Sequence, residues 1–145
     1  KSGLLGIAGK SDFRDIEKAA QNGDKNSKLA IRMFKDSIIK YIAQYYVELG
    51  GKVDAIVFTA GIGENAIDLR RDIVNSISSA MNIELDDEAN NSIAKYKEKQ
   101  SGLISTPNSK IKVLVVPTNE EYMILKDTYN LIQQEKENNY SKIKK

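Results

Sequence analysis

One strand–turn–helix pattern in the middle of the chain constrains the fold most. Residues 53–59 are short, β-branched and almost wholly apolar after Asp54, which is typical of a strand buried on both faces of a parallel sheet. This run leads directly into Ala60–Asn65, which contains two glycines, and a helical pattern follows to about Met81. In open α/β sheets, ligands bind where such strands end. The pattern therefore predicts an α/β domain with a ligand site at the turn.

The rest of the sequence predicts helices on both sides of this unit. Expected helices cover about 11–21, 27–49, 86–99 and 119–134, and expected strands cover 103–106 and 111–116. Ser11 is expected to cap the first helix and Asp86 the third. We expect 1–134 to form a single α/β domain and the polar, lysine-rich residues 135–145 to form a flexible tail. A first strand preceded only by helices suggests that further strands lie upstream of Lys1, in a longer protein.

The composition narrows the chemistry. The chain has no histidine and no cysteine, which excludes Ser-His-Asp and Cys-His triads, disulfides and sites that bind metal through either residue. Its 22 basic and 20 acidic residues nearly cancel, so we expect neither a nucleic-acid nor a membrane partner. No apolar run approaches the roughly 18 residues that span a bilayer. Carboxylates, arginines, hydroxyls and hard metal ions remain, and they serve phosphoryl transfer well.

The turn itself has two interpretations. Gly61 and Gly63 permit a tight turn with positive φ and leave room for a ligand beside the backbone, while the following helix begins with unpaired N–H groups that suit a phosphate or a ribose. Alternatively, the glycines serve only the geometry of a βα turn, with Asn65 as the helix N-cap. The sequence does not match the P-loop, and Ala66 stands where the dinucleotide fingerprint has its third glycine.

A second candidate lies at Ser11-Asp12-Phe13-Arg14-Asp15. The Arg14 guanidinium could stack on a base or pair with a phosphate, and the neighbouring carboxylates could accept ribose hydroxyls. A first helical turn, with Ser11 as the cap and Phe13 packed inward, explains the same residues without a ligand.

A third candidate follows the last expected strand, in Pro117-Thr118-Asn119-Glu120-Glu121. Two carboxylates at the end of a buried strand are placed to hold Mg²⁺, which prefers oxygen ligands. Thr118 and Glu121 also have the spacing of a capping box. The capping box uses Glu121 and gives Glu120 no role. Glu120 is therefore the candidate metal ligand, with Glu121 as the alternative.

Taken together, these segments resemble the C-terminal part of the acetate kinase family. The matching stretches are Lys1-Ser2-Gly3-Leu4-Leu5-Gly6-Ile7-Ala8-Gly9, Ser11-Asp12-Phe13-Arg14-Asp15-Ile16, residues 54–65, and Val115-Val116-Pro117-Thr118-Asn119-Glu120-Glu121-Tyr122. The resemblance covers almost the whole chain, with these stretches in the family's order. The resemblance implies part of a ribonuclease-H-like domain of the actin and hexokinase type, with a mixed sheet flanked by helices. It also implies a cytoplasmic homodimer that uses Mg²⁺ to transfer the ATP γ-phosphoryl to acetate, giving acetyl phosphate and ADP.

The resemblance also assigns roles to individual residues. The residues matching the family's adenosine segment and nucleotide loop are Asp12, Phe13, Arg14, Gly61, Ile62, Gly63, Glu64 and Asn65. Glu120 matches the magnesium carboxylate. No catalytic residue carries over, because the acetate pocket and the phosphoryl-stabilising Arg, His and Asp residues belong to the family's upstream part.

Two alternatives stay open at this point. A propionate or butyrate kinase relative would carry the same segments, since acid choice resides mainly upstream. A non-catalytic nucleotide-binding or interaction module would bind Mg²⁺-ATP without transferring its phosphoryl group to any acid.

Overall fold

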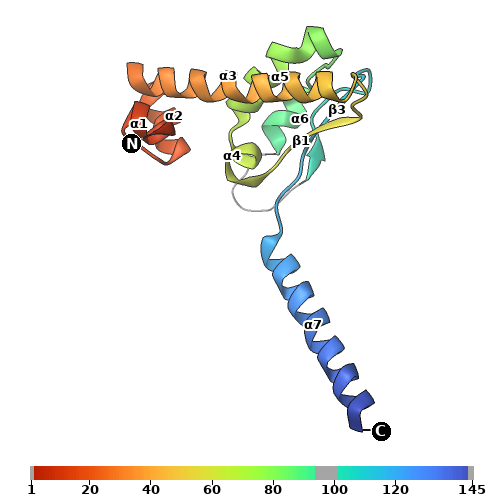
Figure 1. Ribbon diagram of the computed structural model, residues 1–145. Helices are drawn as coiled ribbons and strands as arrows, with labels where there is room; N and C mark the ends of the chain where they lie inside the picture. The colour runs from red at the N-terminus through yellow and green to blue at the C-terminus, as the bar shows by residue number, and fades with distance from the viewer. Residues whose placement is uncertain (1, 94–100, 144–145) are drawn as a thin grey trace.

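Figure 1 shows the computed structural model, which describes residues 2–93 and 101–143. A body of short strands and helices occupies the chain up to the end of its last strand, and the final helix extends away from it. The helices are α1 Gly3–Ala8, α2 Phe13–Gln21, α3 Lys25–Glu48, α4 Ala60–Asn65, α5 Ile67–Met81, α6 Asp87–Ser92 and α7 Glu120–Ile143. The strands are β1 Ala55–Phe58, β2 Gly102–Leu103 and β3 Lys112–Val115.

The three strands form one mixed sheet in the order β1-β3-β2. β1 runs parallel to β3, with Ile56 opposite Val113 and Phe58 opposite Val115, and β2 is antiparallel to β3. Because side chains alternate along a strand, these four residues share one face of the sheet. That face carries the core.

Helices α3 and α5 contribute to the core on this face. The buried cluster combines residues of α5, of the sheet and of the segments that flank the strands: Val74, Ile77, Met81, Ile83, Ile104, Ile111, Val113 and Val115. Partly buried side chains of α3 pack against it, among them Ile39, Ile42 and Tyr46. In Figure 1, α3 runs across the upper part of the body with α1 and α2 beneath one end. The expected α/β architecture with a mixed sheet flanked by helices is confirmed.

The expectation that the strand at 53–59 is buried on both faces is wrong. Within the part of the chain that the structure describes, β1 is an edge strand that pairs only with β3. Its residues alternate between exposed and half-buried, and Val57 is 52% exposed. An apolar run indicates that a strand tolerates burial on both faces. Whether both faces are buried depends on other segments that cover the strand.

Aspartates begin three of the helices. Asp12 caps α2, Asp24 caps α3 and Asp86 caps α6, each by accepting a hydrogen bond from a backbone N–H of the first turn. The expected cap at Asp86 is confirmed. Ser11 is not the cap of the first helix, because Asp12 lies next to that helix and its Oδ1 accepts the Arg14 N–H at 2.9 Å.

The other helices differ from expectation mainly at their ends. The helix expected at 86–99 is observed over Asp87–Ser92, and positions 94–99 of that expectation lie outside the described residues. The last helix begins one residue later than expected and continues to Ile143. The sequence pattern missed α1, a single helical stretch in a glycine-containing segment. No described helix has the length and hydropathy needed to cross a bilayer.

Candidate functional site

The turn after β1 is itself a short helix. The chain leaves β1 through Ala60, whose φ of 59° is left-handed, and then winds into α4. Gly61 and Gly63 would permit a positive φ, but neither glycine has one. Asn65 ends α4, with its Nδ2 donating to the Gly61 carbonyl at 2.8 Å, and Ala66 rather than Asn65 occupies the N-cap position of α5.

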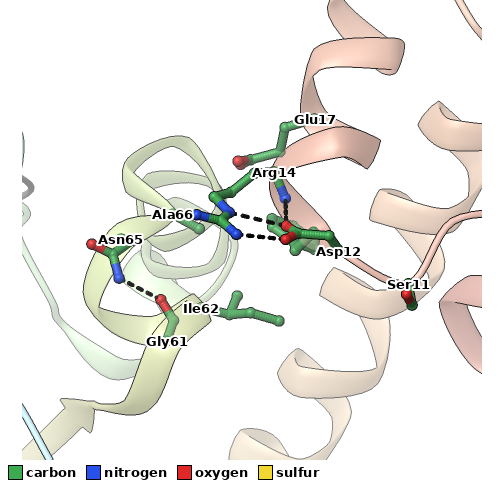
Figure 2. Close-up of a pocket in the computed structure, with 9 residues that line it drawn as sticks. Ser11, Asp12, Arg14, Glu17, Gly61, Ile62, Asn65 and Ala66 are labelled. Carbon is green, nitrogen blue, oxygen red and sulfur yellow. Dashed lines mark hydrogen bonds and ion pairs between the residues drawn. The ribbon is translucent and has the colours of Figure 1, made fainter. Parts of the chain in front are cut away.

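A cavity of about 400 Å³ lies between this turn and the start of α2. Its lining joins both predicted segments: Ser11, Asp12, Phe13, Arg14, Glu17, Gly61, Ile62, Asn65 and Ala66. Figure 2 shows the α2 residues facing α4 across the cavity. Its volume is within the range of small-molecule sites, about 300–1,000 Å³. The structure thus brings together six of the nine predicted site residues.

A small apolar cluster brings the two walls of the cavity together. Phe13 is only 6% exposed and forms a buried cluster with Ala66, Leu69 and Ile73. Its ring also contacts that of Phe34 on α3, with centroids 5.6 Å apart. Phe13 therefore fixes the start of α2 beside the start of α5 while it lines the cavity.

Asp12 and Arg14 form a two-pronged pair at the cavity wall. Arg14 Nε donates to Asp12 Oδ1 at 3.1 Å and Nη2 to Oδ2 at 2.6 Å. These bonds, together with the backbone N–H of Arg14, lower the pKa of Asp12 from 3.8 to about 2. Such pairing fixes the plane of the guanidinium, as Figure 2 shows. Arg14 is thus a flat cation whose orientation is set by Asp12, and its side chain is exposed to solvent.

This pair makes a testable prediction about titration. In Arg14→Ala, we expect the pKa of Asp12 to rise from about 2 toward 3.8, because the side-chain bonds from Arg14 are the largest cause of the shift. It should stay below 3.8, since a backbone N–H still caps onto it. Carbon-13 NMR titration measures this directly. In the parent chain, the stabilisation from ionised Asp12 is present above about pH 4 and is lost as the pH falls through about 2.

Asp24 is the internal control for this titration. Its pKa is also lowered, chiefly by Ser27, whose backbone N–H donates to Asp24 Oδ2 at 2.7 Å, and it lies at the start of a different helix. It should titrate alike in both proteins. An unchanged pKa at Asp12 would show that Arg14 does not hold the carboxylate.

Sequence reasoning missed Glu17, which also lines the cavity. Burial raises the pKa of its carboxyl, and the nearby charge of Asp68 adds to the shift. Glu17 follows Arg14 by three residues on α2, so helical spacing could have placed both on one face. It gives the cavity a second carboxylate besides that of Asp12.

Gly63 and Glu64 are the predicted nucleotide residues of the turn that do not line this cavity. A side chain at Gly63 would meet the Phe58 backbone, so this glycine permits a close approach of α4 to β1. The Glu64 carboxylate accepts hydrogen bonds from the Thr118 N–H at 3.0 Å and from Thr118 Oγ1 at 3.4 Å. Glu64 therefore links the turn to the segment that precedes α7. Their assignment to nucleotide stays a prediction.

Glu120 lies outside the cavity, in the first turn of α7. It lines a separate shallow hollow with Tyr122, Met123 and other residues of that turn. Among the described residues, no group of three or more acidic side chains could hold a metal by itself. The bond between Glu64 and Thr118 keeps the start of α7 next to the turn. Because Mg²⁺ is commonly held by one or two carboxylates plus substrate phosphates, a single carboxylate here fits a metal carried in with a nucleotide.

Known proteins share this arrangement of segments. An acetate kinase of Treponema denticola is 50% identical over 134 residues, which are 92% of this chain and 32% of that protein. A crystal structure of Porphyromonas gingivalis acetate kinase matches 91% of this chain and 32% of its own, with a TM-score of 0.79 and 40% identity. A propionate kinase from Francisella tularensis covers 85% of this chain and 29% of its own, with a TM-score of 0.71 and 38% identity.

These similarities confirm the fold class that the resemblance implied. They also show that the chain spans about a third of the length of the relatives it matches. The sequence profile described as the Acetokinase family matches residues 1–126, which is most of the chain. The chain belongs to the acetokinase family.

Proposed function

We propose that this chain is the nucleotide-binding part of an acetate kinase, which transfers the ATP γ-phosphoryl to acetate and yields acetyl phosphate and ADP. One observation carries the proposal: Asp12–Arg14 and the turn at Gly61, far apart in the sequence, line one cavity of nucleotide size. Family membership supplies the reaction. The cavity supplies the place for the nucleotide.

Within this cavity the residues divide the work by chemistry. Arg14, with its plane fixed by Asp12, presents a flat cation to the base. The Glu17 and Asp12 carboxylates accept hydrogen bonds from ribose hydroxyls or amino groups of the base. Gly61 and Ile62 form the opposite wall, close to the ligand because Gly61 has no side chain. In this proposal Gly63 and Glu64 hold the turn in place.

Mg²⁺ belongs to the same proposal, with Glu120 as its protein carboxylate. When bound, the ion would neutralise phosphate charge during transfer. Glu120 would orient it through an oxygen ligand or a bound water, with most other ligands coming from the nucleotide and solvent. The Glu64–Thr118 bonds would keep that carboxylate within reach of the turn.

The acceptor acid, the homodimer and the cytoplasmic location are further parts of this proposal. Acetate is the substrate named for most of the similar proteins, while one similar structure is named a propionate kinase. We therefore propose acetate first and propionate or butyrate as alternatives. The composition favours small-molecule partners over nucleic acid or membranes.

ADP binding tests the proposal, with Arg14→Ala as the informative variant. Loss of a stacked cation is expected to weaken ADP binding about threefold to thirtyfold in isothermal titration calorimetry with Mg²⁺ present. Lys18→Ala is the matched control, because Lys18 is an exposed cation on the same helix that does not line the cavity. The site assignment is wrong if the parent binds ADP and both variants bind it equally well.

A non-catalytic nucleotide-binding module is the second candidate function. It is favoured by the lining of the cavity, in which Arg14 is the cation among the described residues and is already paired with Asp12. Both functions predict ADP binding. They differ in turnover when the whole protein is assayed.

A further inference from the structure

A buried arginine lies beneath the turn and outside the cavity. Arg70 on α5 is 1% exposed. Its Nη1 donates to the carbonyls of Gly63 at 2.9 Å and Glu64 at 2.7 Å. Its Nε donates to Asn90 Oδ1 at 2.8 Å and its Nη2 to the Asn90 carbonyl at 3.0 Å. One guanidinium therefore connects α4, α5 and α6.

The partners of Arg70 are unusual for a buried cation. All four are neutral carbonyl or amide oxygens, and no carboxylate of the described residues forms an ion pair with it. Burying a charge this way costs solvation free energy, which an apolar side chain of similar size would avoid. Two of the four contacts that offset this cost are to carbonyls near the C-terminal end of α4, where a cation is favourable. The arrangement thus stabilises one conformation of the turn.

The neighbouring Arg71 shows what a purely structural link looks like. It also connects α5 to α6, through an ion pair with Asp87 and a bond to Asn91, and it forms a second ion pair within α5, with Asp68. These three partners lie on the exposed side of the two helices, and none of them belongs to α4. The two adjacent arginines therefore share the α5–α6 link, and Arg70 alone adds contacts to the turn.

We propose that Arg70 is a positioning residue for nucleotide binding, a buried guanidinium that holds the Gly63 and Glu64 end of α4 so that the cavity wall at Gly61 is preformed. The Glu64 side chain extends this hold to Thr118, two residues before Glu120. Arg70 thereby keeps the nucleotide wall and the proposed magnesium carboxylate in a fixed relation. The link to nucleotide rests on the proposed function, whereas the hold on α4 does not.

The experiment compares Arg70→Lys with Arg71→Lys in the whole chain. Lysine keeps the charge but cannot span four oxygens in three directions. Amide hydrogen exchange should speed up in α4 about tenfold to hundredfold for Arg70→Lys, with little change there for Arg71→Lys. ADP affinity should fall by a similar factor in the first variant and stay within about twofold of the parent in the second.

A second variant guards against failure of Arg70→Lys to fold. Asn90→Ala removes one acceptor of Arg70 and leaves its bonds to α4, so it should raise α4 exchange and weaken ADP binding by smaller factors in the same direction. A residue with only a structural role would instead speed exchange throughout α5 and α6, as Arg71→Lys should. Equal α4 exchange in Arg70→Lys and Arg71→Lys would overturn the inference. Absence of ADP binding in the parent would overturn the proposed function, and the exchange comparison would still decide whether Arg70 holds α4.

Discussion

Replacing Gly61 with valine is expected to weaken ADP binding about tenfold to hundredfold while leaving the fold intact. Gly61 lines the cavity, its φ is not positive, and a Cβ built on it meets no protein atom within 4 Å. The added valine side chain should therefore change the free energy of unfolding little, and it would occupy space that a nucleotide needs. Calorimetric titration with ADP measures the loss, and thermal unfolding checks that the variant remains folded.

Gly63 supplies the matched control for this substitution. It lies two residues further along α4 and does not line the cavity, but a Cβ there would lie 3.3 Å from the carbonyl carbon of Phe58. Gly63→Ala should therefore lower the free energy of unfolding by about 1–3 kcal/mol, with a smaller effect on ADP binding well below the melting temperature. The reverse pattern, with Gly61→Val unstable and Gly63→Ala defective in binding, would contradict the location of the cavity.

These two glycines illustrate how far the sequence predicts the turn. The Gly-x-Gly pattern correctly indicates a tight connection between β1 and the next helix, because few other residues allow such close backbone packing. The physical reason differs from the expected one. Ala60 has the left-handed conformation, and Gly63 is needed for its approach to Phe58. Backbone angles and packing distances depend on neighbours that a local pattern does not specify.

The same distinction applies to the fold and to the residues around the cavity. Periodicity predicts α3 and α5 well, because the apolar residues of each helix recur at three- and four-residue steps in the sequence. The apolar pattern of β1 does not predict that one face of this strand is exposed, because that exposure depends on which other segments cover the strand. Periodicity also gives no sign of Arg70, whose partner Asn90 lies 20 residues away in the sequence. An arginine in a helical pattern is usually exposed, so its burial could not be expected.

Assayed alone, this chain is expected to turn over acetate and ATP at less than about one thousandth of the rate of a full-length relative. Phosphoryl transfer depends on cations and a metal that stabilise charge on the transferring group, and a single well-placed arginine can contribute a factor of about 10³–10⁵. Among the described residues that line the cavity, Arg14 is the cation, and it is already paired with Asp12. We therefore expect the cavity to hold a nucleotide without moving its phosphoryl group.

The hydroxamate assay for acetyl phosphate tests this expectation, with acetate, propionate and butyrate supplied in parallel. The control is a full-length acetate kinase such as that of Treponema denticola, assayed beside its own segment matching this chain, so that length is the only difference within that pair. Both short proteins should bind ADP and both should lack turnover. If this chain turned over acetate at a rate comparable to the full-length control, its own 145 residues would have to stabilise the transferring phosphoryl group.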